Sequence, residues 1–297
     1  MSTAVQRVRT PVLEIAYEAT GPASAPAVVL LHGFPYDPRC FDAVVPLLVA
    51  QGMRAIVPYV RGFGATRFLS PDTPRSGQQA AIGQDLLDLL DALAIDRALL
   101  AGFDWGARAA CVVAALWPGR VRGLVSACGY LIQDIARAGE PADPEQERRY
   151  WYHYYFNTER GRAGLAANRR ELCALLWKLW SPRCPFDPQA YGRTAASFDN
   201  ADFVDVTVHA YRHRYGYAPG DPRYDAIESR LARLPLIGVP TIALHGESDD
   251  VIPASTSESH ARFFTAGYER RLLACGHSPA HEAPEAFARA ILDLSWP

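Results

Sequence analysis

Short apolar runs alternate with amphipathic stretches from the start of the chain to Gly129. Ala27–Leu31 and Val121–Ala127 are short and largely apolar, as expected for strands buried on both faces of a sheet. In Ile82–Leu93, apolar residues recur at i, i+3 and i+4, which predicts a helix with one buried face. The alternation predicts an α/β fold, with a mostly parallel sheet covered by helices on both faces. The other elements expected here are strands at Arg54–Pro58 and Ala98–Phe103 and helices at Phe41–Ala50 and Ala107–Trp117.

The alternation stops after Gly129 and resumes only at Val239–His245. The residues between are rich in Arg, Tyr and Trp, are interrupted by prolines and contain no clear buried-strand run, which predicts a helical insertion. A further strand near Tyr268–Leu273 and a helix near Pro284–Leu294 close the chain. The expected domains are a core in two pieces, residues 1–130 and 232–297, and a helical cap, residues 131–231.

Composition and charge narrow the range of partners. The formal net charge is −2 at pH 7, so neither a nucleic acid nor an anionic membrane surface is an expected partner. No apolar run reaches the roughly 18 residues needed to cross a bilayer, and Met1–Thr10 lacks the apolar stretch of a secretory signal. The 6 cysteines form no CxxC pair, which is typical of reduced thiols in the cytoplasm. We therefore expect a cytoplasmic protein, a monomer or homodimer, that acts on a small molecule.

The strongest chemical signal is Gly102-Phe103-Asp104-Trp105-Gly106, between a predicted strand and a predicted helix. This G-x-nucleophile-x-G form is typical of a sharp turn that exposes its middle residue at the carboxyl edge of the sheet, and the glycines relieve the crowding of the turn. A carboxylate can attack carbon electrophiles, and the start of a helix favours its ionised form. An aspartate that only caps a helix has the same local pattern. The assignment of Asp104 as a nucleophile therefore depends on the other motifs.

Two later loops offer an acid and a base. Asp249, in Gly246-Glu247-Ser248-Asp249-Asp250, has the better spacing for an acid that orients a histidine, and Asp250 remains the alternative. His277 lies on a loop before the last helix, where a base is expected, and the competing His281 lies at the start of that helix. No group of His and Cys has metal-ligand spacing, so we expect neither a metal nor another cofactor.

These motifs together resemble the α/β-hydrolase superfamily, and within it the aspartate-nucleophile branch of epoxide hydrolases and haloalkane or haloacetate dehalogenases. The resemblance implies an α/β-hydrolase fold with an inserted cap, and Asp104, Asp249 and His277 follow one another in the order of that family. It also implies an oxyanion hole formed by the backbone N–H groups of Phe34 and Trp105. The motifs that carry the resemblance are His32-Gly33-Phe34-Pro35, Val60-Arg61-Gly62-Phe63-Gly64, Gly102–Gly106, Gly246–Asp249 and Cys275-Gly276-His277.

Cap tyrosines favour an epoxide as the substrate. Epoxide hydrolases typically donate to the leaving oxygen from two such tyrosines. The segment Tyr150–Asn157 resembles their Y-x-x-Y-F pattern, which identifies Tyr152 as the first, and Ala210-Tyr211-Arg212 resembles the stretch that holds the second, Tyr211. Because the segment is a nearly unbroken run of ring-bearing side chains, Tyr154 or Tyr155 is an alternative for the residue that faces the pocket.

A dehalogenase would instead bind a halide through donors such as an indole N–H, and Trp105, Trp177 and Trp180 are available for that role. Fluoroacetate dehalogenases carry arginines one and four residues after the nucleophile, but here Trp105 replaces the first and only Arg108 remains. Their cap also carries a His-Trp pair, of which this chain keeps His153 alone. Both departures favour an epoxide over a haloacid.

The sequence therefore predicts an epoxide hydrolase that forms a vicinal diol through an ester on Asp104. We expect Trp105, His153 and Phe34 to contact an apolar or aryl epoxide. A haloalkane or haloacid dehalogenase with the same catalytic residues is the first alternative. A non-catalytic ligand-binding protein on the same fold is the second.

Overall fold

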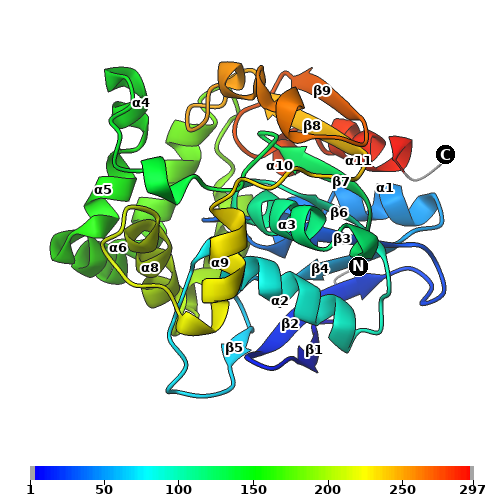
Figure 1. The fold of residues 1–297 in the computed structure, drawn as a ribbon, viewed down its shortest axis with the longest axis horizontal. Coiled ribbons are helices and arrows are strands. Elements are labelled where there is room, and N and C mark those ends of the chain that lie inside the picture. The colour runs from blue at the N-terminus through cyan, green and yellow to red at the C-terminus, as the bar shows by residue number, and fades with distance from the viewer. Residues whose placement is uncertain (1–3, 295–297) are drawn as a thin grey trace.

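One mixed sheet runs through the centre of the structure, a computed structural model that describes residues 4–294 (Figure 1). Its strands lie in the order β1, β2, β4, β3, β6, β7, β8 and β9, and β5 pairs with β2. Neighbouring strands from β4 to β9 are parallel, whereas β2 is antiparallel to β1, β4 and β5. The strands are β1 (Gln6–Arg9), β2 (Leu13–Thr20), β3 (Ala27–Leu31), β4 (Arg54–Pro58), β5 (Arg67–Phe68), β6 (Ala98–Gly102), β7 (Val121–Ala127), β8 (Thr241–Gly246) and β9 (Tyr268–Leu273).

The predicted parallel strands are confirmed, most of them with the expected bounds. β6 ends one residue earlier than expected and β8 begins two residues later. The antiparallel edge strands were not predicted from the sequence. The reason is visible in β1 and β2, because β1 is largely exposed and β2 carries charged residues at Glu14 and Glu18, so neither has the apolar run typical of a buried strand.

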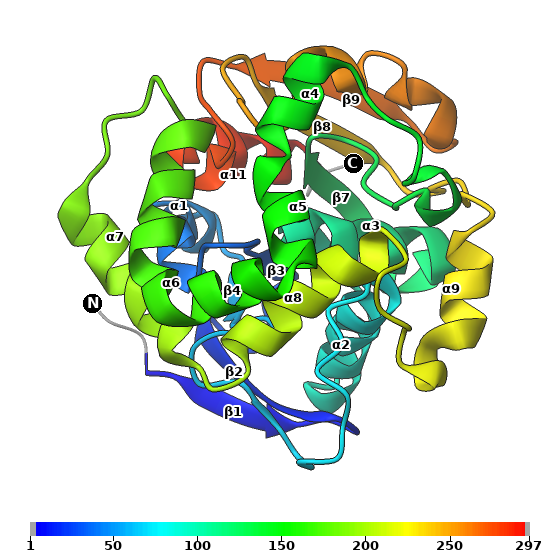
Figure 2. The same cartoon turned by 90° about the vertical axis from the view of Figure 1, so that its left-hand side faces the viewer.

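Helices cover both faces of the sheet (Figure 2). On one face α2 (Gln79–Ala92) packs against α3 (Asp104–Leu116), which contacts β6 and β7. On the other, α1 (Val44–Ala50) packs against α11 (Pro284–Asp293), while α10 (Pro279–Glu282) precedes α11. Helix α1 starts at Val44 and not at the predicted Phe41, because Phe41 belongs to a separate 3₁₀ turn, Pro38–Phe41. The predicted α/β-hydrolase architecture is thus confirmed.

The segment between β7 and β8 is helical, and residues 131–231 contain no strand. Figure 1 shows α4, α5, α6 and α8 gathered beside one end of the sheet, and Figure 2 shows the same helices in front of it. The division of the chain into core and cap domains stays a prediction. None of the helices within residues 4–294 combines the length and apolar composition that crossing a bilayer requires. The inserted helices are α4 (Pro144–Arg149), α5 (Trp151–Asn157), α6 (Glu159–Trp180), α7 (Pro188–Ala195), α8 (Phe203–Arg214) and α9 (Asp225–Leu231).

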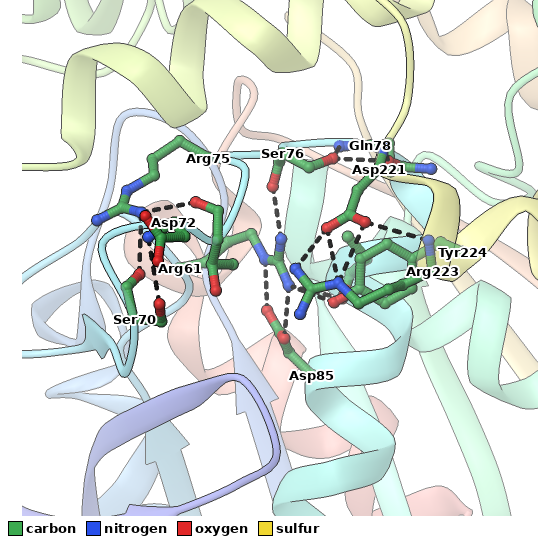
Figure 3. Close-up of polar contacts among 12 residues, drawn as sticks. Arg61, Ser70, Asp72, Arg75, Ser76, Gln78, Asp85, Asp221, Arg223 and Tyr224 are labelled. Carbon is green, nitrogen blue, oxygen red and sulfur yellow. Dashed lines mark hydrogen bonds and ion pairs between the residues drawn. The ribbon is translucent and has the colours of Figure 1, made fainter.

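Arg61 joins the sheet to the end of the helical insertion (Figure 3). Its side chain is 1% exposed and donates to both carboxylate oxygens of Asp85 on α2, each at 2.6 Å. The same guanidinium donates to the carbonyl of Ser76 at 2.5 Å and to the hydroxyl of Tyr224, just before α9, at 3.4 Å. Since a buried charge is costly unless it is paired and hydrogen-bonded, these contacts fix the loop after β4 against α2 and the end of the insertion.

Candidate active site

Asp104 occupies a crowded turn between β6 and α3. Its φ is +51°, in the left-handed region that side chains rarely adopt. A Cβ at Gly106 would lie 2.1 Å from the carbonyl oxygen of Leu31, and one at Gly102 would lie 2.7 Å from the same atom. Both glycines are therefore needed for the turn to pack against β3. This is the strained strand-to-helix turn that the sequence motif predicts.

The Asp104 carboxylate points at the loop that follows β3. The backbone N–H of Phe34 donates to its Oδ1 at 2.8 Å. A Cβ at Gly33 would lie 2.3 Å from that oxygen, so the carboxylate fills the space that a side chain would need. In the histidine-glycine-phenylalanine-proline motif after β3, Phe34 thus supplies a backbone donor, and Gly33 leaves room for the carboxylate because it has no side chain.

The charge state of Asp104 follows from competing effects. Burial favours the neutral acid, but His277, the Arg108 guanidinium and the backbone N–H of Trp105 outweigh burial and hold the pKa of Asp104 below its ordinary value. The carboxylate is therefore ionised and able to act as a nucleophile at neutral pH. The N–H groups of Phe34 and Trp105 both serve this carboxylate, at the positions predicted for the oxyanion hole.

His277 and Asp249 form a buried pair behind Asp104. The Nδ1 atom of His277 lies 2.9 Å from Oδ2 of Asp249. The other carboxylate oxygen of Asp249 accepts from the backbone N–H groups of Val251 and Ile252 at 2.8 and 3.0 Å. These bonds fix the orientation of the carboxylate, and with it the orientation of the imidazole.

The free nitrogen of His277 faces the candidate nucleophile. Its Nε2 lies 3.9 Å from Oδ2 of Asp104, and it has no hydrogen-bond partner among residues 4–294. Burial disfavours the charged ring, but the carboxylates of Asp249 and Asp104 outweigh burial and raise the pKa of His277 to about 10. The histidine is therefore protonated while both carboxylates are charged.

Asp250 and His281, the alternatives for the acid and the base, contact other residues. Asp250 pairs with Arg149, whose Nε is 3.0 Å from the Asp250 carboxylate. His281 packs against the ring of Trp177, with 5.5 Å between ring centroids. The geometry thus favours Asp249 and His277.

Tyr152 and Tyr211 come from different helices, contact each other and line the same cavity as Asp104. Tyr152 on α5 is 2% exposed, Tyr211 on α8 is 5% exposed, and their ring centroids are 5.4 Å apart. Burial and the charge of Asp104 both raise the pKa of each hydroxyl, so both are neutral donors. Tyr154 is 40% exposed and donates to Glu147, while the hydroxyl of Tyr155 packs against Gly164. The two alternative tyrosines therefore do not share this position.

A cavity of about 250 Å³ lies between the sheet and the helical insertion. Trp105 and His153 line it, as expected, whereas the ring of Phe34 is fully buried and is not among the residues that line it. Burial and the positive charges of Arg214 and Arg108 lower the pKa of His153 well below its ordinary value, so this ring is neutral. The charged and aromatic residues of α3, α5 and α8 that line the cavity are Asp104, Trp105, Arg108, Tyr152, His153, Tyr211 and Arg214, and Tyr150 lines it just before α5.

The other two candidate halide donors are not in the cavity lining. The indole N–H of Trp177 donates to the carbonyl of Pro35 at 2.8 Å. The Trp180 ring packs edge-on against His277, with centroids 5.2 Å apart. Of the three indoles considered, only that of Trp105 reaches the cavity, which weakens the dehalogenase alternative.

Sequence reasoning missed Cys128 and Arg214. Cys128 follows β7 with φ +69°, and its thiol donates to Oδ2 of Asp249 at 3.5 Å. Among the described residues, Cys128, Asp249 and His277 are the one group whose ligand atoms all lie within 4.8 Å, as a metal site would need. The hydrogen bonds of Asp249 to Nδ1 of His277 and to the Cys128 thiol already explain why these three residues lie close together, so their spacing does not by itself indicate a metal site. Neither Cys128 nor Arg214 belongs to a sequence motif that would have identified it.

The space occupied by the Asp104 carboxylate yields a prediction for Gly33→Ala. The added methyl must displace the carboxylate from the Phe34 N–H, so we expect kcat/KM for any reaction that begins at Asp104 to fall by about 100-fold or more. Gly119→Ala is the matched control, because nothing lies within 4 Å of the added atom. Steady-state kinetics and thermal melting of both variants check this. Wild-type kcat/KM in a folded Gly33→Ala protein would contradict the geometry.

Known proteins resemble this chain in sequence and in fold. The model of the alpha/beta hydrolase fold family matches residues 26–284. The crystal structure of a "putative epoxide hydrolase" from Klebsiella pneumoniae subsp. pneumoniae MGH 78578 is 45% identical, with a TM-score of 0.95 over 98% of this chain and 96% of that chain.

Curated proteins resemble shorter parts of the chain or resemble it more distantly. "Epoxide hydrolase 2" of Siraitia grosvenorii is 43% identical over 103 residues, which span 35% of this chain and 32% of that relative. "Epoxide hydrolase A" of Mycobacterium tuberculosis is 24% identical over 303 residues, 92% of this chain and 91% of that protein. The family match over residues 26–284 and the full-length likeness at 45% identity lead to one conclusion: this chain belongs to the alpha/beta hydrolase fold family.

Proposed function

We propose that this protein is an epoxide hydrolase in which the Asp104 carboxylate attacks an epoxide carbon. The observation that carries the proposal is that two buried tyrosines and an ionised aspartate line the same small cavity, close enough for the charge of the aspartate to act on both hydroxyls. An epoxide needs a nucleophile on carbon and a donor at its oxygen at the same time. Tyr152 and Tyr211 are the neutral donors, and Asp104 is the nucleophile.

In the first step a bond forms between an Asp104 oxygen and the epoxide carbon while the ring C–O bond breaks. The departing oxygen takes a proton from Tyr152 or Tyr211. Ester formation removes the negative charge of Asp104, which is one cause of the high pKa of His277. The proton of His277 then restores the tyrosine, and the imidazole is left neutral.

In the second step the neutral His277, oriented by Asp249, takes a proton from water as the water attacks the ester carbonyl. The backbone N–H groups of Phe34 and Trp105 stabilise the resulting oxyanion, a contribution of about 3 kcal/mol for one such donor in other enzymes. Collapse breaks the ester bond, and the diol leaves with the proton of the new carboxyl group. Asp104 and protonated His277 are restored, so epoxide and water give a vicinal diol with no other reactant.

We further propose that Asp104, His277 and Asp249 act as a catalytic triad beneath a cap domain and that the protein is cytoplasmic. The six free cysteines, of which only Cys184 is not buried, support a reducing environment. Trp105 and the two tyrosines offer an apolar wall for the body of a small-molecule substrate.

Blocking the second step must trap the ester. We expect His277→Gln to accumulate an adduct equal in mass to the substrate on the peptide that carries Asp104, because its side chain cannot take the proton from water. Asp104→Asn should form neither adduct nor diol. Mass spectrometry of intact and digested protein after mixing with styrene oxide, a simple aryl epoxide, is the measurement. Normal turnover by His277→Gln with no adduct would rule out the two-step scheme.

Removing both cap hydroxyls must prevent ring opening. We expect Tyr152→Phe with Tyr211→Phe to lower the rate of ester formation by at least about 100-fold, the loss of a positioned proton donor. Tyr154→Phe is the matched control, because its hydroxyl points to Glu147 at the surface. Rapid-mixing kinetics with excess enzyme measures this rate. Ester formation at the control rate in the double variant would remove the tyrosines from the mechanism.

The pH dependence of ester hydrolysis tests the change in His277. The base acts when deprotonated, so the hydrolysis rate must rise with pH through the pKa of His277 in the ester. That pKa must lie below the value of about 10 in the free protein, because the ester has lost the charge of Asp104. Single-turnover decay of the ester over a pH series measures it. A half-maximal rate at the pKa of the free protein would show that ester formation does not release the proton.

A further inference from the structure

We propose that Arg108 and Arg214 form a subsite for a carboxylate, so that the epoxide opened by this protein carries an anionic group near its ring. The inference rests on the proposed function and narrows its substrate class. The expectation of an apolar or aryl epoxide describes only the body of such a substrate.

Arg108 is a buried cation with unmet hydrogen-bonding capacity. It is 9% exposed and lines the cavity, and its buried Nε has no partner in the part of the chain that the structure describes. None of its nitrogens takes part in an ion pair or hydrogen bond recorded for residues 4–294. The charge of Asp104 favours the charged guanidinium but Asp104 forms no ion pair with it, and guanidinium donors are rarely left unsatisfied. An anion in the cavity would supply the missing acceptor.

Arg214, at the end of α8, adds a second charge to the same cavity. Its guanidinium lies over the rings of Tyr150 and Tyr215, at 5.4 and 5.8 Å from their centroids. No carboxylate among residues 4–294 forms an ion pair with it. Arg214 and burial together lower the pKa of Arg108, a sign that the two like charges repel each other. Two adjacent unpaired arginines stabilise a site only if something negative joins them.

The carboxylates around the cavity do not pair with the two arginines. Arg108, Arg214 and protonated His277 are positive, the catalytic carboxylates are Asp104 and Asp249, and Asp134 also lines the cavity. His153 and His260 have pKa values lowered by burial and by neighbouring cations and are neutral. Among residues 4–294 none of these three carboxylates forms an ion pair with Arg108 or Arg214, so an anionic ligand would be their direct partner.

Position along α3 limits the distance between the anion and the reacting carbon. Arg108 follows Asp104 by four residues, which puts both on one face of the helix with their Cα atoms about 6 Å apart. A carboxylate bound by Arg108 therefore lies within a few bonds of the attacked carbon. An epoxide with a carboxylate on or next to the ring fits this spacing.

Arg214 also lies on the way to the cavity. It lines both the inner cavity and a neighbouring one of about 360 Å³, and Tyr150 lines both as well. An anion that passes from the outer to the inner cavity would meet Arg214 first and Arg108 next. The planar guanidinium of each arginine matches the two oxygens of a carboxylate.

Binding of unreactive ligands tests the subsite independently of any turnover. Phenylacetate and phenylacetamide have nearly the same shape and differ in charge. We expect phenylacetate to bind the wild-type protein about 10- to 100-fold more tightly in calorimetric titration, the range of a charge-assisted hydrogen bond. Arg108→Gln and Arg214→Gln should each bring this affinity ratio towards one. Equal affinities of the two ligands for the wild-type protein would overturn the proposal.

Two further sets of variants separate charge, shape and folding. Arg162→Gln removes one positive charge from an exposed ion pair with Asp205 and should keep the wild-type affinity ratio. Arg108→Lys and Arg214→Lys keep the charge and should retain part of the ratio. Thermal melting identifies a variant that fails to fold, in which case its lysine counterpart supplies the result. A ratio that falls equally in Arg162→Gln would assign the effect to overall charge and overturn the subsite.

Kinetics with matched epoxides separates this inference from the proposed function. The substrates are 3-phenylglycidate and 3-phenylglycidamide, scored for diol by kcat/KM. A ratio well above 10 that falls in the glutamine variants supports both proposals. Equal opening of the two epoxides supports the hydrolase and overturns the subsite. Failure to open either epoxide, with selective phenylacetate binding retained, overturns the hydrolase alone, and halide release from a 2-haloacid would then identify the reaction.

Discussion

The site depends on one steric constraint: the Asp104 carboxylate occupies the volume that a side chain at position 33 would fill. Glycine is also required at positions 102 and 106, because β3 passes too close to the turn for a Cβ. The strained φ of +51° at Asp104 is tolerated because β6, α3 and the loop after β3 hold it from three sides. That arrangement brings the carboxylate to the Phe34 N–H and leaves its second oxygen 3.9 Å from His277.

Electrostatics then link the two chemical steps. His277 lies between two carboxylates, which hold its proton while Asp104 is charged and release it once Asp104 becomes an ester. Asp249 keeps its own charge, because four donors hold its oxygens in place. Arg108 and Arg214 line the same cavity, and Arg108 also helps to keep Asp104 ionised, but neither arginine gives up or accepts a proton in the two steps. Their position points to substrate selection as their role.

Much of the core could be predicted because burial leaves a local signal. Ala27–Leu31 is apolar at every position and Val121–Ala127 at most positions, since helices cover both faces of those strands. The edge strand Gln6–Arg9 is largely exposed and gave no such signal. In the site, Asp104 and His277 belong to motifs of fixed spacing, whereas Arg214 reaches the cavity only because α5 and α8 pack together. The burial of the Phe34 ring depends on the same packing, which no local spacing records.

The central claim is that the Asp104 carboxylate, and not water, forms the first bond to the epoxide carbon. A single turnover in H₂¹⁸O, with enzyme in excess over styrene oxide, tests it most directly. The mechanism predicts that the first diol contains no ¹⁸O and that the label appears in the carboxylate of Asp104, found by mass spectrometry of its peptide. A first diol that contains ¹⁸O, together with an unlabelled Asp104, would contradict the account.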